Sequence, residues 1–214
     1  MTAHTTILAT STGPYVFWIT SRGAGIAALI LSSLSVSLGL LMAGGRGRTR
    51  RADMRVAHEA LALSTLAALV IHGLSLLGDG YLHPSLADVA IPFAGSYRTV
   101  WTAAGIIAFW SLAILGLSYY LRAKIGAQRW RSLHRLTAVA WILGIVHSLG
   151  DGTDAGQTWF LAMTATVVAP AVLLLLIRHL RPAGLRGAPA QPLPRHTGRG
   201  VGAPASEMQG AGSR

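Results

Sequence analysis

The chain has 214 residues, of which 52% are hydrophobic and only 12% are charged, and its mean hydropathy is +0.50. Soluble domains carry about 25% charged residues, so this composition excludes an ordinary soluble fold. The net charge of +11 does not indicate nucleic-acid binding, because almost all basic residues lie between long apolar blocks or after the last one. The absence of cysteine excludes disulfides, zinc–thiolate sites and iron–sulfur clusters.

Five apolar blocks are long enough for a helix to cross a bilayer. In lipid the backbone must satisfy its own hydrogen bonds, so we predict an all-α integral membrane bundle of five transmembrane helices. The first block has no preceding Lys or Arg and no small-residue cleavage site after it, which favours a retained helix over a signal peptide. The predicted spans are 16–42, 56–77, 99–121, 133–149 and 158–180.

The predicted organisation has an external N-terminus, a membrane domain with a short surface helix, and a tail. Residues 1–15 form an external N-terminus, and residues 16–181 form the membrane domain. Within it, residues 78–97 have a mixed character that predicts a short helix on the external membrane surface. Residues 182–214 are rich in Pro, Gly, Ala and Arg without apolar periodicity, which predicts a disordered tail.

The distribution of basic residues predicts the orientation. Sixteen of the eighteen Lys and Arg residues fall in the loops 43–55 and 122–135 or after residue 177, whereas only Arg22 and Arg98 lie at the opposite ends of the helices. Cytoplasmic loops carry the excess of basic residues. We therefore predict a multi-pass protein of the inner (plasma) membrane with its N-terminus outside and its tail in the cytoplasm.

Four histidines lie in the second and fourth predicted helices at matched depths. His58 and His134 each follow an arginine by three residues near the predicted cytoplasmic surface, and His72 and His147 lie toward the outside. Ionisable residues inside a bilayer are costly and face the bundle interior. Two histidines at equal depth on neighbouring helices can bind one haem iron from both faces. The two levels are separated by roughly 20 Å.

The spacing within the fourth helix predicts an irregularity. The 14 residues from His58 to His72 keep both side chains on one face of a helix, but the 13 residues from His134 to His147 fall about 140° short of a whole number of turns. We therefore expect a tightened stretch or a kink in the fourth helix, with Gly144 as its natural place.

Several stretches resemble the ferric reductase-like transmembrane family, the membrane cores of ferric reductases and NADPH oxidases. Within that family they are most similar to the haem-binding membrane subunits of bacterial methionine sulfoxide reductase systems. The resemblance covers roughly residues 15–180. It is carried by the histidine spacings and by four segments: Ser21-Arg22-Gly23, His58 to Leu63, Pro92 to Arg98, and Trp130 to Leu136.

This resemblance implies b-type haem, two per chain, with iron ligated by His58 with His134 and by His72 with His147. The chain departs from the oxidases in having five spans rather than six and no C-terminal flavin and nicotinamide domain. The implied role is that of an oxidoreductase electron-transfer subunit without its own NAD(P)H domain. FMN or a quinone is then expected on the donor side.

Three other residues have two open interpretations. Trp141 lies midway between the two histidine levels, where it either shortens the electron path or fills a helix interface. Arg22 and Arg98 either bind the propionates of the outer haem or anchor helix ends at the membrane interface. His4, His83, His179 and His196 are interpreted as solvated and without a role.

Our first hypothesis is a transmembrane b-type cytochrome. The donor is a cytoplasmic flavin reductase or a membrane quinol, and the acceptor is an external reductase or ferric iron. The alternative is a transition-metal or haem transporter, for which the helices with histidines offer no acidic or Met partner at mid-membrane depth. A structural membrane subunit that keeps histidines for packing is the third hypothesis.

The predicted orientation is tested with topology reporters. A reporter fused after Leu180 should read cytoplasmic, and one inserted near Asp154 should read external. An external reading at the C-terminal fusion would mean that a span has been miscounted.

Overall fold

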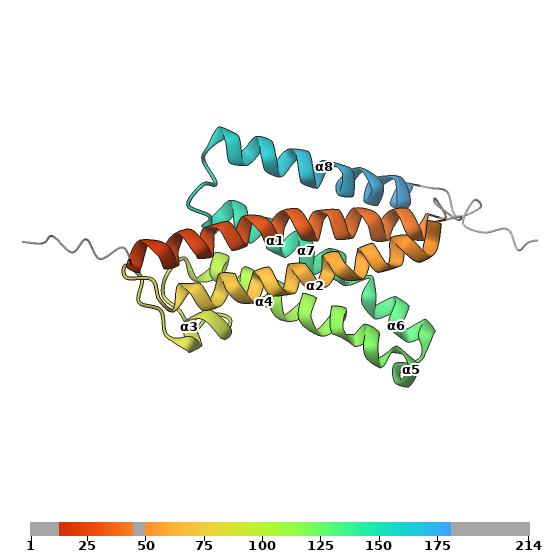
Figure 1. Cartoon of the computed structure of the whole chain (residues 1–214), viewed down its shortest axis with the longest axis horizontal. Helices are drawn as coiled ribbons and strands as arrows, with labels where there is room; N and C mark the ends of the chain where they lie inside the picture. The colour runs from red at the N-terminus through yellow and green to blue at the C-terminus, as the bar shows by residue number, and fades with distance from the viewer. Residues whose placement is uncertain (1–12, 45–49, 181–214) are drawn as a thin grey trace, which may run out of the picture. The chain divides into compact units, whose positions relative to one another are not determined.

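The computed structural model describes residues 13–44 and 50–180 of the chain (Figure 1). The predicted tail from residue 182 and most of the predicted N-terminal segment lie outside the described residues. The same holds for His4, His196 and several predicted cytoplasmic basic residues, namely Arg46, Arg48, Arg181, Arg186, Arg195, Arg199 and Arg214.

The described residues are helical and contain no strand. The helices are α1 (Gly13–Ala43), α2 (Arg51–Leu76), α3 (Leu86–Ala90), α4 (Thr99–Leu117), η2 (Ser118–Leu121), α5 (Arg122–Ile125), α6 (Ala127–His134), α7 (Thr137–Asp151) and α8 (Thr158–Leu180). Within this part of the chain five helical segments are long and apolar enough to span a membrane: Tyr15–Ala43, Arg51–Leu76, Thr99–Ile125, Ala127–Asp151 and Thr158–Leu180. The prediction of a five-helix membrane protein is confirmed at this level.

The predicted irregularity exists, but Gly144 is the wrong place for it. The fourth span is divided into α6 and α7 by a turn at residues 135–136, directly after His134. Gly144 lies inside continuous α7, because a glycine alone costs a helix only about 1 kcal/mol and leaves its hydrogen-bond ladder intact.

The turn after His134 keeps its backbone hydrogen-bonded. The Leu136 N–H donates to the Leu133 carbonyl at 2.9 Å, and the Thr137 hydroxyl donates to the His134 carbonyl at 2.7 Å. These bonds span three residues, and such a tightened turn advances about 20° more per residue than an α-helix. His134 and His147 therefore lie on two separate helices, and the turn between them changes the angle between the two side chains from that in one regular helix.

The bundle consists of two helix pairs in contact. Helix α1 packs along α2, α4 packs along α7, and α1 also touches α7 (Figure 1). At the α1–α7 contact the fully buried Trp141 indole donates its Nε1–H to the Ser33 hydroxyl at 3.1 Å. Helix α8 contributes the buried side chains Phe160, Thr164 and Ala171.

The predicted short helix between the second and third spans is α3. Its N-cap Ser85 forms a capping box with Asp88, in which each side chain accepts the other residue's backbone N–H. The hydrogen bonds from the Ser85 backbone and hydroxyl hold the pKa of Asp88 below its usual range. The Trp110 indole of α4 donates to the Ala90 carbonyl at 2.8 Å, which ties the end of α3 to the bundle.

Candidate functional site

The structure brings the four intramembrane histidines together in two pairs. The rings of His58 on α2 and His134 at the end of α6 have centroids 6.1 Å apart and planes at 87°. The rings of His72 on α2 and His147 on α7 have centroids 6.3 Å apart and planes at 70°. We call these the His58 pair and the His72 pair. These are the two pairs that the sequence predicted from the equal depths of the histidines in the second and fourth spans.

Three of the four rings are oriented by backbone carbonyls of a neighbouring helix. Nδ1 lies 3.0 Å from the Ser35 carbonyl for His58, 2.8 Å from the Ser21 carbonyl for His72, and 3.0 Å from the Trp101 carbonyl for His147. A carbonyl oxygen can only accept, so each Nδ1 carries the hydrogen. Nε2 of each ring then has the free lone pair that a metal requires.

His134 is held differently. Its Nδ1 is buried without a hydrogen-bond partner of good geometry, although the Leu115 carbonyl of α4 interacts with the ring. The indole of Trp130 stacks on the imidazole, with centroids 4.9 Å apart and planes at 21°. Aromatic packing by a residue one turn earlier on α6 therefore orients this ring.

Helix α1 carries a repeated element that the sequence interpretation missed. Ser21 and Ser35 are 14 residues apart, as are Gly25 and Gly39, and this spacing equals that of His58 and His72. Because α1 and α2 run antiparallel, each Ser-x-x-x-Gly unit faces one histidine. The equal spacing of the serines, the glycines and the two histidines can be read from the sequence, and it could have identified these α1 residues.

The two glycines and the two serines of this repeat do different things. A β-carbon at Gly25 would lie 3.1 Å from Nδ1 of His72, and one at Gly39 would lie 3.2 Å from Cε1 of His58. The bare backbone thus allows α2 to approach closely enough for the imidazoles to reach α1 carbonyls. The serine hydroxyls lie 3.1 Å and 3.2 Å from the same Nδ1 atoms.

Gly105 on α4 plays the corresponding part for His147. A β-carbon at this position would lie 2.7 Å from Nδ1 of His147, closer than such atoms approach in practice. The helix backbone and the imidazole ring are therefore packed directly against each other. A larger residue would have to displace the ring from the Trp101 carbonyl.

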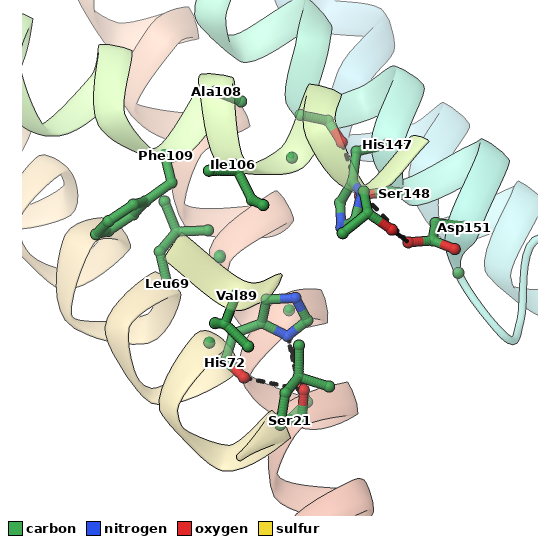
Figure 2. A pocket seen from close by; sticks show the side chains of 18 of the residues that line it. Ser21, Leu69, His72, Val89, Ile106, Ala108, Phe109, His147, Ser148 and Asp151 are labelled. Atoms are coloured by element: carbon green, nitrogen blue, oxygen red, sulfur yellow. Dashed lines mark hydrogen bonds and ion pairs between the residues drawn. The ribbon is translucent and has the colours of Figure 1, made fainter. Parts of the chain in front are cut away.

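A cavity of about 460 Å³ opens between the helices at the His72 pair (Figure 2). Figure 2 shows His72 and His147 projecting into it from different helices. Its size is within the range of about 300–1,000 Å³ that is usual for ligand pockets. Its walls are mainly apolar, with Leu69, Ile106 and Phe109 among them, and Trp141 lines the cavity where it extends toward the His58 pair.

The two arginines proposed as propionate ligands already have partners within the chain. The Arg22 guanidinium donates from Nε and Nη2 to the two carboxylate oxygens of Asp154, and it lines the cavity. Arg98 donates to the Gly150 carbonyl at 2.6 Å, and its backbone is left-handed with φ of 39°. These contacts join the start of α1 and of α4 to the residues that end α7.

Three other residues considered in the sequence lie away from the cavity, and a fourth, Thr65, is one of the residues that line it. Glu59 turns from its neighbour His58 and accepts a hydrogen bond from the Tyr120 hydroxyl at 2.7 Å. His83 is exposed in the loop before α3, with φ of 45°, and His179 is exposed near the end of α8. Thr65, level with Trp141, is buried and donates its hydroxyl to the Leu61 carbonyl at 2.8 Å.

Comparison with known proteins identifies the family. Residues 24–145 match the family described as "Ferric reductase like transmembrane component", and this range includes His58, His72 and His134. No curated protein and no solved structure matches the chain. Because the matched range is more than half of the sequence, the chain belongs to the ferric reductase-like transmembrane family.

Proposed function

We propose that the chain is a transmembrane b-type cytochrome that carries electrons across the membrane through two haems, one at each histidine pair. The observation that carries the proposal is the geometry of the pairs, in which two imidazole rings from different helices lie with their centroids 6.1 Å and 6.3 Å apart. Haem supplies the one-electron redox chemistry. The protein would supply the histidines, their spacing and, at the His72 pair, a mainly apolar cavity.

The ring separations agree with iron between two imidazoles. A bond from a metal ion to an imidazole nitrogen is about 2.0–2.1 Å. Adding about 1.2 Å from each nitrogen to its ring centre gives a centroid separation of about 6.4 Å for two collinear bonds. The observed separations are 6.1 Å and 6.3 Å. Aromatic rings that pack directly on each other have centroid separations anywhere between about 4.5 and 7 Å. Direct packing of the imidazoles would therefore not favour separations close to the metal-bridged value.

The number of ligands favours haem over a free metal ion. A structural or transported Zn²⁺ needs about four protein ligands, and no group of three or more His, Cys, Asp or Glu side chains suited to a metal ion occurs in the described part of the chain. A porphyrin brings four nitrogens and requires only two axial ligands. The pairs therefore support the cytochrome over the transition-metal transporter.

The presence of two histidines at each site also favours electron transfer over oxygen chemistry. A haem held by both imidazoles of a pair would have no open position for a substrate. The two sites are 14 residues apart on α2, or about 21 Å along the helix axis. Trp141 lies between them as a buried aromatic ring, held by Ser33, so either of its two interpretations agrees with its position.

We further propose the direction of transfer from the charge distribution. Exposed basic side chains surround the end of the bundle that holds the His58 pair, among them Arg51, Arg55, Arg131 and Arg135. Such a surface attracts an acidic donor protein, and the same charges are expected on a cytoplasmic face. A cytoplasmic flavin reductase or a membrane quinol would deliver electrons there. An external reductase or ferric iron would receive them beyond the His72 pair.

The haem content of purified protein tests this proposal. We expect sharp reduced α and Soret bands and a haem-to-protein ratio close to two. His58→Ala and His134→Ala should each remove one haem, and His72→Ala and His147→Ala should each remove the other. Colourless protein from cells grown with ample haem would contradict the proposal, and a ratio of one with a single sensitive pair would contradict the two-site scheme.

The close approach of α4 to His147 gives a second test, which uses glycine variants of one helix. Gly105→Ala should displace the His147 ring and lower the haem-to-protein ratio from two toward one. Gly116→Ala on the same helix is the matched control, because a β-carbon there meets nothing within 4 Å. It should keep both haems and the stability of the unmodified protein, since alanine is the better helix former. Equal haem loss in both variants would show that the effect is not local to His147.

A further inference from the structure

Asp151 is the last residue of α7 and lies one turn after His147. One of its carboxylate oxygens is 3.8 Å from Nδ1 of His147 and accepts a hydrogen bond from the Thr102 hydroxyl at 2.9 Å. The other oxygen is buried and has no hydrogen-bond partner. Figure 2 shows Asp151 beside His147, on the side away from His72. An anionic group thus lies directly behind one histidine of the His72 pair.

The other acidic residues that line the same cavity already have partners. Asp154 is neutralised by the Arg22 guanidinium. Asp79 accepts the backbone N–H groups of Tyr81 and Leu82 at 2.7 Å and 3.0 Å, and Asp88 belongs to the capping box of α3. Four acidic residues line the cavity. Asp151 is the one whose carboxylate accepts a hydrogen bond from a single hydroxyl group only, that of Thr102.

The His58 pair lacks this arrangement. The ring of His134 is covered by the Trp130 indole, and His58 is bound by the Ser35 carbonyl and hydroxyl. The neighbouring carboxylate of Glu59 is engaged by Tyr120. The structure therefore places a carboxylate oxygen 3.8 Å from an imidazole nitrogen at the His72 pair, whereas the groups that contact the rings of the His58 pair, Trp130 and Ser35, are neutral.

We propose that Asp151 is a positioning residue that lowers the reduction potential of the haem at the His72 pair relative to the haem at the His58 pair. This inference rests on the proposed function. The Nδ1–H of His147 donates to the Trp101 carbonyl, so the Asp151 carboxylate, 3.8 Å from that nitrogen, would act through its charge and not through a hydrogen bond. A negative charge would stabilise the more positively charged oxidised iron, and the low dielectric of the bundle increases this effect. The charge therefore favours the oxidised state.

The experiment is a redox titration of the full-length protein in detergent, followed by visible absorption, with haem content measured in parallel. Asp151→Asn removes the charge and keeps an acceptor for Thr102. It should shift the reduction equilibrium of one haem about tenfold toward the reduced state, which is about 59 mV for a one-electron couple. The second haem should keep its midpoint potential. The shifted haem is assigned by repeating the titration in the His134→Ala background, where only the His72 pair should hold haem.

Three further variants separate charge from structure. Asp151→Glu restores the charge and should return the midpoint potential most of the way to that of the unmodified protein. Thr102→Val removes the hydroxyl that holds the carboxylate and should leave both haems bound. Asp53→Asn is the matched charge control, because that carboxylate is exposed in the first turn of α2 and lies 19 residues before His72, and it should shift the potential of the haem at the His72 pair much less than Asp151→Asn.

Several outcomes would overturn the inference. An unchanged midpoint potential in Asp151→Asn, or an equal shift of both haems, would mean that the carboxylate does not act through His147. Loss of one haem in both Asp151→Asn and Thr102→Val would mean that Asp151 only ties α7 to α4. Failure of the proposed function is distinguishable, because the unmodified protein would then contain no haem at the His72 pair and His72→Ala would not change the haem content.

Discussion

The hydrogen bond from an imidazole Nδ1 to a carbonyl inside a neighbouring helix is the interaction on which the arrangement of the bundle depends. In hydrocarbon no water can satisfy the ring nitrogen, so the neighbouring helix must supply the acceptor. A helical carbonyl has a second lone pair to offer. The carbonyls of Ser21 and Ser35 use it for His72 and His58. This single contact fixes the tautomer, the ring orientation and the separation of two helices.

Such a contact requires backbones to come close together, which explains where the small residues lie. Gly25, Gly39 and Gly105 each face an imidazole ring, and a β-carbon would be tightly packed at the first two positions and would clash at Gly105. Small residues at helix interfaces are a general feature of membrane bundles, because close packing replaces the hydrophobic effect there. In this chain the small residues do more than pack the helices, since they bring a hydrogen-bond acceptor within reach of each ring.

The two histidine pairs have the same spacing but different surroundings, and this difference bears on function. The His58 pair is supported by a carbonyl and by an aromatic ring. The His72 pair is supported by two carbonyls, with the carboxylate of Asp151 near His147. When two haems differ in reduction potential, an electron resides more often on the haem with the higher potential. In the proposed cytochrome, these neutral and charged neighbours of the histidines would give the two haems different potentials.

The sequence alone determined the membrane class, the helical architecture and the partners within each histidine pair. Long apolar blocks admit only helices in lipid, and equal depth on the second and fourth spans decides which histidines can meet. The capped helix before the third span was also predictable, because its Ser and Asp signals are local in the sequence. The Ser-x-x-x-Gly repeat on α1 was present in the sequence as well, at the spacing of His58 and His72.

Only the tertiary structure decided the rotation of the fourth span and the neighbours of each ring. The interruption follows His134 rather than falling at Gly144, because its place depends on how α6 and α7 pack against other helices and not on local helix propensity. The contacts of His72 with Ser21 and of His147 with Trp101 join residues 51 and 46 positions apart. Hydropathy and periodicity describe one helix at a time, so they place Asp151 on the same face as His147 but carry no information about which carbonyl of another helix faces a given imidazole.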